Sequence, residues 1–221
     1  MTDRHTEFVI ANTIVTHAAA VPEIALHLAT EVTPLWQASE ETLQQNGLPP
    51  PYWAFAWPGG QAFARLMLDK PELVRGRTIL DFAAGSGIAA IAAVRSGAAR
   101  AVASEIDDFA LAAVKLNADL NGTNIYICNK DLLIDPPTRY DIILAGDVCY
   151  ERPMASRVLA WLDLAVSAGI EVLVADPGRA YLPGGGLTEL GRYDIPTSLD
   201  LENRKMMTTV IYRYAPQDSA S

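Results

Sequence analysis

Acidic residues and glycines follow short apolar runs in this 221-residue chain, at a spacing that could bind a ligand. In TILDFAAGSG, from Thr78 to Gly87, a β-branched run leads to Asp81 and then to a turn with Gly85. The Ala-rich segment that follows predicts a strand, a tight turn and a helix. Glycines permit positive φ and let a ligand approach the main chain. Free N–H groups at the helix start favour a carboxylate or phosphate there, and Ser86 is available to cap them.

Two further polar groups follow the next predicted strands. Glu105 lies 20 positions beyond Gly85, where the second strand of a βαβ unit ends and an acid can accept hydrogen bonds from ribose hydroxyls. The alternative is a charge at a helix start, although Asp107 already occupies that capping place. After the third strand, Asn129 and Asp131 could reach an adenine amino group. Asp131 could equally cap a turn.

A third acid ends the apolar run YDIILAGD, which predicts a buried strand that terminates at Asp147, three residues before Tyr150. Ligands of open α/β sheets bind at the carboxyl ends of the strands, so this carboxylate is a candidate for chemistry. The chain lacks the dinucleotide pattern G-x-G-x-x-G because Ala90 stands where its last glycine would be. A nicotinamide dehydrogenase is therefore disfavoured.

Aromatic residues gather just before the glycine turn, in PYWAFAWPGG at 51–60. They could form the wall of a pocket for a planar ligand, with Trp57 as the expected contact. They could equally anchor the following helix in the core.

The pattern of elements predicts an α/β domain. Seven strands are expected after residue 76, at 78–81, 101–105, 124–128, 140–147, 170–176, 193–201 and 206–214, the last two as an antiparallel hairpin. Helices are expected at 61–70, 88–94, 109–120 and 152–167. Residues 1–50 are expected to form an extension packed on the core, with a helix at 6–17, a strand at 23–32 and a helix at 34–45. Residues 51–214 form the domain, and 215–221 a flexible tail.

Composition limits the classes of partner. Lys and Arg number 17 against 26 Asp and Glu, a net charge of -9, without a basic run, which disfavours nucleic acid. A basic protein or a small cation suits this field better. Cys128 and Cys149 lack metal-ligand spacing, so we expect buried thiols, no metal and a reducing compartment. No apolar run has the length of a membrane span and no targeting segment is apparent, so we expect a cytoplasmic protein without a membrane partner.

Several motifs together resemble a known family. The tetrad Asp147-Val-Cys-Tyr150, with the glycine turn and the terminal hairpin, is typical of the D-x-x-Y group of seven-β-strand S-adenosylmethionine-dependent methyltransferases. PYWAFAWPGGQ at 51–61, DFAAGSG at 81–87, GDVCY at 146–150 and DPGR at 176–179 resemble more closely the lysine methyltransferases of the electron transfer flavoprotein β-subunit. The resemblance covers residues 6–214, with WPGG and DPGR as its specific part. Ala83 departs from the glycine that is usual in the family.

The resemblance implies a Rossmann-like three-layer αβα sandwich with a seven-stranded, mostly parallel sheet. It also implies that S-adenosylmethionine donates methyl groups to a lysine of the electron transfer flavoprotein β-subunit and leaves S-adenosylhomocysteine. Asp147 and Tyr150 would then be catalytic, and the expected cofactor contacts are Trp57, Asp81, Ala83, Gly85, Gly87, Glu105, Asn129 and Asp131. A small-molecule N-methyltransferase and a non-catalytic partner-binding domain stay open as alternatives.

Overall fold

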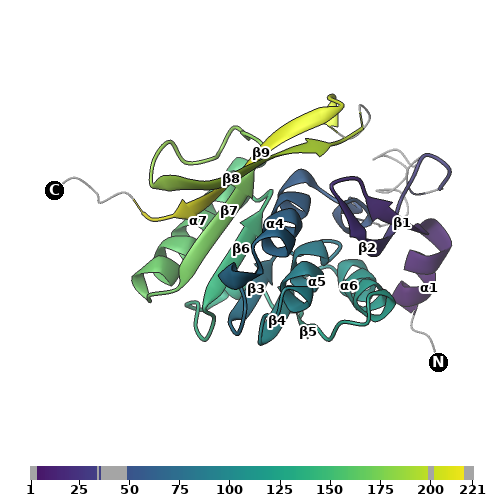
Figure 1. Cartoon of the computed structure of the whole chain (residues 1–221), viewed down its shortest axis with the longest axis horizontal. Helices are drawn as coiled ribbons and strands as arrows, with labels where there is room; N and C mark the ends of the chain where they lie inside the picture. Colours follow the sequence, from purple (N-terminus) through teal and green to yellow (C-terminus); the bar gives the residue numbers. More distant parts are fainter. Residues whose placement is uncertain (1–3, 34, 36–48, 199–201, 217–221) are drawn as a thin grey trace.

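A seven-stranded sheet forms the centre of the computed structural model, which describes residues 4–33, 35, 49–198 and 202–216 (Figure 1). The strand order is β5-β4-β3-β6-β7-β9-β8. The strands are β3 Thr78–Phe82, β4 Arg100–Ser104, β5 Tyr126–Cys128, β6 Ile142–Gly146, β7 Glu171–Asp176, β8 Leu187–Pro196 and β9 Met206–Tyr214. The first five are parallel, whereas β9 is antiparallel to β7 and to β8. The predicted mostly parallel sheet with a C-terminal hairpin is confirmed.

Helices cover both faces of the sheet, as the three-layer prediction requires (Figure 1). These helices are α4 Pro58–Asp69, α5 Ile88–Arg95, α6 Asp108–Leu120 and α7 Arg152–Ser167. Of these four, α4, α5 and α6 lie on one face of the sheet and α7 on the opposite face. Along β6, Ile142 and Leu144 pack toward α4 and α5, whereas Ile143 and Ala145 pack toward α7. Successive side chains of a strand point to opposite faces, so a continuous apolar run is buried on both.

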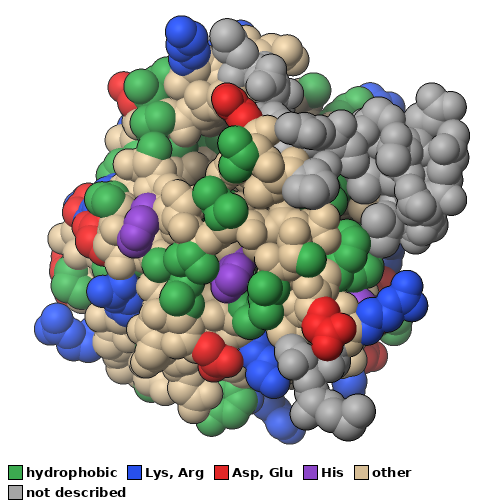
Figure 2. Space-filling model, turned by 90° about the vertical axis from the view of Figure 1, so that its right-hand side faces the viewer, with side chains coloured by type: hydrophobic (Ala, Val, Ile, Leu, Met, Phe, Trp, Pro, Cys, Tyr) green, Lys and Arg blue, Asp and Glu red, His purple; other side chains and the backbone are tan. Residues whose placement is uncertain are grey.

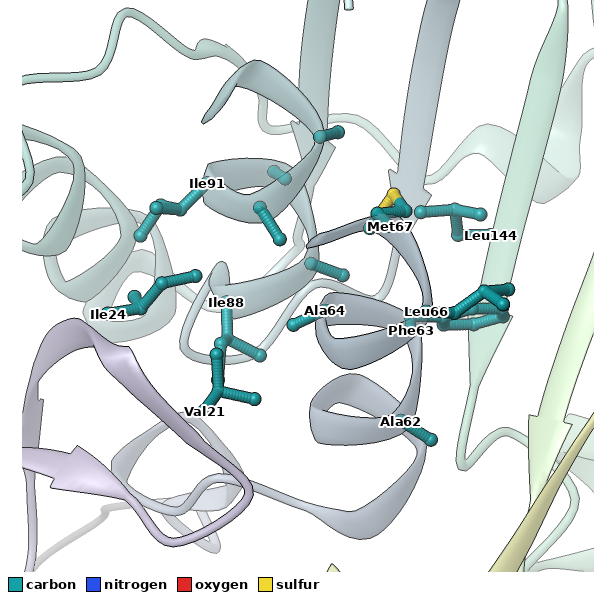
Figure 3. Packing of buried hydrophobic residues seen from close by; sticks show 14 of the residues in the cluster. Val21, Ile24, Ala62, Phe63, Ala64, Leu66, Met67, Ile88, Ile91 and Leu144 are labelled. Carbon is teal, nitrogen blue, oxygen red and sulfur yellow. The ribbon is translucent and has the colours of Figure 1, made fainter. Parts of the chain in front are cut away.

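The core on the α4 face also includes the N-terminal segment. Met67 of α4 lies beside Leu144 of β6, and Phe63 points toward the sheet one turn away, while Ile88 of α5 lies beside Val21 of the N-terminal hairpin (Figure 3). All five are at most 2% exposed. Residues before 50 thus bury apolar surface in the same core as the sheet, and the boundary at residue 50 stays a prediction.

The N-terminal elements differ from those expected. They are α1 Arg4–Asn12, β1 Ile14–Ala18 and β2 Val21–Leu28, and the two strands form an antiparallel hairpin. The predicted helix at 6–17 is wrong beyond Asn12. Thr13 donates its hydroxyl hydrogen to the Val9 carbonyl at the helix end, and the β-branched residues that follow pair with β2. The expected strand at 23–32 begins two residues earlier and ends at Leu28. The expected helix at 34–45 lies outside the described residues.

The C-terminal hairpin also begins earlier than expected. β8 starts at Leu187 rather than at residue 193, because β9 offers it backbone partners as far as Tyr214. The described helices include none that is long and apolar enough to cross a membrane. Figure 2 shows the end of the molecule that carries β1, β2 and α1, where hydrophobic side chains lie among charges of both signs. The excess of acids is therefore not gathered on this visible face.

Candidate active site

A cavity of about 640 Å³ opens along the carboxyl ends of β3, β4 and β6. In the sheet, β3 lies between β4 and β6, so the chain continues from β3 to one side and later returns to the other. This reversal of strand order is the switch point at which α/β sheets bind ligands. The predicted site residues that line this cavity are Trp57, Asp81, Ala83, Gly85, Glu105, Asp131, Asp147 and Tyr150. Gly87 and Asn129 are not among its lining residues.

The turn after β3 has the positive φ angles that its glycines predict. Gly85 has a φ of 54° and Gly87 a φ of 77°, and Gly87 is the N-cap of α5. A Cβ on Gly87 would lie 3.2 Å from both γ-carbons of Val114, so this position also needs a small residue. Ala83 has a φ of 52° as well. An alanine there costs about 1–2 kcal/mol more than in the right-handed region.

Asp81 supports the helix that follows this turn. Its Oδ2 accepts the Ala90 N–H, the third in α5, at 2.9 Å. The prediction that Ser86 caps α5 is wrong. Gly87 occupies the N-cap position, and the N-cap residue makes no side-chain hydrogen bond to the start of the helix. Burial, with the nearby Glu105 as a lesser cause, raises the pKa of Asp81 to about 8. A cationic group beside it would favour the charged carboxylate.

Glu105 joins the second strand end to the glycine turn. Its Oε1 accepts the Gly85 N–H at 2.8 Å, and its Oε2 accepts the Ile106 N–H at 3.2 Å. Burial raises its pKa. Each carboxylate oxygen can accept a further hydrogen bond from a ligand hydroxyl. The side chain of Ile106 is 73% exposed and lines the cavity, an apolar contact that the sequence analysis missed.

Asp131 shows the turn-capping geometry that was its alternative interpretation. Its Oδ1 accepts the Leu133 N–H at 3.0 Å, and its Oδ2 forms an ion pair with Arg157 at 3.1 Å. It also lines the cavity, beside Lys130. The adenine contact expected of Asn129 and Asp131 stays a prediction.

The aromatic segment both lines the cavity and contributes to the core, and the ligand contact expected of Trp57 stays a prediction. Trp53 is buried in the core and also lines the cavity. Trp57 lines the cavity as well, and its indole N–H donates to the Tyr52 carbonyl at 2.7 Å. The Tyr52 ring lies 6.0 Å from that of Trp57 and 5.8 Å from that of Tyr150, between their centroids. Tyr52, Trp57 and Tyr150 thus form an aromatic rim that joins two distant motifs.

Asp147 caps a helix from across the fold. It follows β6 with a φ of 55°, and its Oδ2 accepts the Gly59 N–H at 2.6 Å. Gly59 is the second residue of α4, whose N-cap, Trp57, makes no side-chain cap of its own. A Cβ on Gly59 would lie only 2.5 Å from Oδ2. The WPGG and GDVCY motifs therefore fit together here, a contact that the sequence analysis missed.

The second oxygen of Asp147 has capacity for a further hydrogen bond. Oδ1 is buried and accepts no hydrogen bond from the described residues. Burial raises the pKa of this carboxyl to about 7, although Arg179 and the Gly59 N–H both lower it. A carboxylate with such a pKa can orient a cationic amine and can also take up a proton near neutral pH.

The two cysteines were expected to be buried thiols. Both are free thiols, and Cys149 is buried whereas Cys128 is half-buried. Burial raises the pKa of Cys149 to about 12, with Asp176 and Asp147 as lesser causes. Within the described ranges, no three His, Cys, Asp or Glu side chains are grouped to hold a metal ion.

Comparisons with known proteins give the family. The family model of ribosomal protein L11 methyltransferase matches residues 66–148. The electron transfer flavoprotein β-subunit lysine methyltransferase of Danio rerio is 38% identical over 214 residues, which cover 94% of this chain and 82% of that protein.

Solved structures share the fold. The ribosomal protein L11 methylase of Lactobacillus delbrueckii subsp. bulgaricus has a TM-score of 0.51 at 23% identity, over 72% of this chain and 81% of that one. A magnesium protoporphyrin IX methyltransferase from Synechocystis PCC 6803, solved with bound SAH, has a TM-score of 0.50 at 17% identity, over 71% and 81%. Because its identity to the Danio rerio relative extends over most of both proteins, the chain belongs to the family of electron transfer flavoprotein β-subunit lysine methyltransferases.

Proposed function

We propose that this chain transfers methyl groups from S-adenosylmethionine to a lysine of the electron transfer flavoprotein β-subunit. Family membership supports the reaction and the substrate. The observation that carries the proposal is that one cavity is lined both by the buried acids beside the glycine turn and by Asp147, whose Oδ1 accepts no hydrogen bond from the described residues. A donor and an acceptor would therefore lie in the same space.

The donor would lie along the glycine turn. Asp81 would accept from its ammonium group, because a cation offsets the cost of that buried carboxylate. Glu105 would accept from the ribose hydroxyls, and Trp57 would form one wall. The backbone at 83–87 would hold the methionine end, and the polar residues at 129–131 the adenine end. When bound, S-adenosylmethionine would supply a sulfonium methyl group that an aligned amine could accept, with the neutral thioether S-adenosylhomocysteine as the leaving group.

The acceptor would enter past the aromatic rim. A lysine with an ordinary pKa of about 10.4 is protonated at neutral pH and must lose a proton before its nitrogen can attack. Oδ1 of Asp147 would accept a hydrogen bond from this amine and fix its direction, and a pKa of about 7 also lets this carboxylate take up the proton. Tyr150, 40% exposed at the rim, would orient the amine by its ring or hydroxyl.

We further propose that the partner is protein rather than nucleic acid or membrane, and that the reaction takes place in the cytoplasm. The excess of acidic over basic residues supports a cationic acceptor.

The test offers isotopically methyl-labelled S-adenosylmethionine to the protein with two acceptors, the purified flavoprotein β-subunit and a mixture of free lysine and small amines. We expect label on a lysine of the β-subunit, located by mass spectrometry. Asp147→Asn should lose the label while it still binds S-adenosylhomocysteine. Label on the small amines alone would replace the proposal by a small-molecule methyltransferase. No label on either acceptor from a folded protein would favour a non-catalytic binding domain.

A further inference from the structure

The DPGR motif at 176–179 has no part in the reaction proposed above, yet its arginine lines the same cavity. Asp176 ends β7, and its Oδ1 accepts the N–H groups of Gly178 at 2.7 Å and Arg179 at 2.6 Å. This turn fixes the backbone of Arg179. The motif is thus built to place one guanidinium group.

Glu202 holds that guanidinium group by two hydrogen bonds. Its oxygens accept from Nη2 of Arg179 at 2.6 Å and from Nη1 at 3.0 Å, and its side chain is only 5% exposed. Nη2 also lies 3.7 Å from Oδ1 of Asp147. That separation is too long for a hydrogen bond but short enough for a strong interaction between charges in a buried site.

The group of Asp147, Asp176, Arg179 and Glu202 has unused hydrogen-bonding capacity. Oδ1 of Asp147, Oδ2 of Asp176 and Nε of Arg179 are all buried without a partner in the described part of the chain. Three carboxyl groups thus share one guanidinium, so an entering ammonium group would add positive charge and a donor for Oδ1 of Asp147.

We propose that Arg179 is a positioning residue for Asp147, and that Glu202 restrains its guanidinium so that the free carboxylate oxygen stays charged and open to the acceptor amine. This inference rests on the proposed function, because it assigns the acceptor to Asp147.

Arg179 and Glu202 are each needed for a different reason. Burial disfavours the charged form of Asp147, and Arg179 opposes this by lowering its pKa. Without Glu202, however, Arg179 would be free to close the remaining gap and form a charge-assisted hydrogen bond with Oδ1. The guanidinium would then occupy the place of the amine.

The groups around Asp147 determine in which direction its pKa moves when Arg179 is replaced. Asp176 and Glu202 raise its pKa, whereas Arg179 and the Gly59 N–H lower it. The Cys149 thiol stays neutral across the working range, because burial raises its pKa to about 12. Removal of the arginine charge should therefore move the titration of Asp147 to higher pH.

The first experiment needs no acceptor. Carbon-13 NMR follows the titration of the Asp147 carboxyl group in the full-length protein, with the signal assigned by Asp147→Asn. We expect Arg179→Gln to raise the midpoint by about one pH unit or more. Arg179→Lys should stay close to wild type because it keeps the charge. An unchanged midpoint in Arg179→Gln would overturn the proposal.

The second experiment separates KM from kcat with the flavoprotein β-subunit as acceptor. Glu202→Gln should raise KM for the acceptor by about tenfold and change kcat less, because the freed guanidinium competes with the amine. Affinity for S-adenosylhomocysteine should stay within about twofold of wild type. In an Arg179→Gln background, Glu202→Gln should have no further effect on KM, because no guanidinium remains to compete.

Glu189→Gln is the matched control. Glu189 forms a 2.6 Å ion pair with Arg192 on β8, both half exposed and outside the cavity, and its removal should leave KM unchanged. An equal rise of KM in Glu189→Gln, or no rise in Glu202→Gln, would contradict the proposal. If the wild-type protein methylates nothing, the proposed function fails, whereas the NMR titration still decides whether Arg179 controls the charge of Asp147. Should Arg179→Gln not fold, the KM of Glu202→Gln against that of Glu189→Gln still decides the proposal.

Discussion

Asp81 is 5% exposed, and its carboxyl group accepts the N–H of Ala90 but has no cationic partner among the described residues. Burial raises its pKa to about 8, so the charged form is costly in the free protein. The same charge would become useful when an ammonium group binds. Such a residue is expected to lower stability in exchange for function.

We therefore predict opposite effects of Asp81→Asn on stability and on binding. The amide oxygen can still accept from Ala90, so the free energy of unfolding in urea at pH 8.5 should rise by about 1 kcal/mol or more. Binding of S-adenosylhomocysteine should weaken by about tenfold or more, because a charge-assisted hydrogen bond is lost. A less stable variant with intact binding would show that Asp81 is only a helix cap.

Sequence reasoning at this scale locates a residue where its surroundings are local. Asp81 lies near the end of β3 and Glu105 directly follows β4, and the sheet brings these two strand ends to the same cavity. The contact between Gly59 and Asp147 joins residues 88 positions apart, and that between Arg179 and Glu202 joins residues 23 apart. Neither lies within one local motif, so only the folded chain reveals them.

Among the elements, α4 depends most closely on its meeting with β6. Gly59 and Gly60 both lie in its first turn, so alanine raises helix propensity equally at either position. A Cβ on Gly59 would meet Asp147 Oδ2 at 2.5 Å and the Ala175 carbonyl oxygen at 2.9 Å. A Cβ on Gly60 would meet only a methyl group of Ile88, at 3.1 Å.

Gly59→Ala and Gly60→Ala therefore form a matched pair. We predict that Gly59→Ala lowers the free energy of unfolding by about 1–3 kcal/mol and greatly reduces methyl transfer, because α4 must shift away from Asp147. Gly60→Ala should change stability by less than about 1 kcal/mol, because the Ile88 side chain can adjust. Urea denaturation and a transfer assay measure both effects. Equal behaviour of the two variants would contradict the close fit of these elements.

The elements themselves were predicted most accurately where local pattern and long-range pairing agree. The bounds of α7 and β9 match the prediction, and their periodicity and turn residues leave little choice. The N-terminal helix was overextended because Ile14–Ala18 becomes a strand only through pairing with β2. β8 was placed too late for the same reason, since its first residues pair with the end of β9.

Across the part of the molecule that the structure describes, more acids have a raised pKa than a lowered one. Burial raises the pKa of Asp81 to about 8 and that of Asp147 to about 7, and it also raises that of Asp176. Ion pairs lower the pKa of Glu23 and Glu171. A raised pKa means that the folded state binds more protons than the unfolded state, so stability falls as pH rises from about 4 to about 8.

We accordingly predict a higher Tm at pH 5.5 than at pH 8.5 for the ligand-free protein, measured by calorimetry at constant ionic strength. The net negative charge of the protein also grows as the pH rises, and its self-repulsion lowers the stability of the folded state further. Asp81→Asn should make this slope shallower because it removes one of the groups responsible. A Tm that rises between these pH values would mean that the buried acids are better stabilised than their surroundings indicate.

The central claim is that the cavity along β3, β4 and β6 binds the methyl donor through Asp81 and Glu105. Isothermal titration calorimetry with S-adenosylhomocysteine tests this claim most directly. We predict one molecule bound per chain. Affinity should be at least about tenfold weaker in Glu105→Gln, which loses a charged acceptor, and unchanged in the surface control Glu189→Gln. Folded wild-type protein that binds no S-adenosylhomocysteine, or a Glu105→Gln variant that binds it as tightly as wild type, would contradict the account.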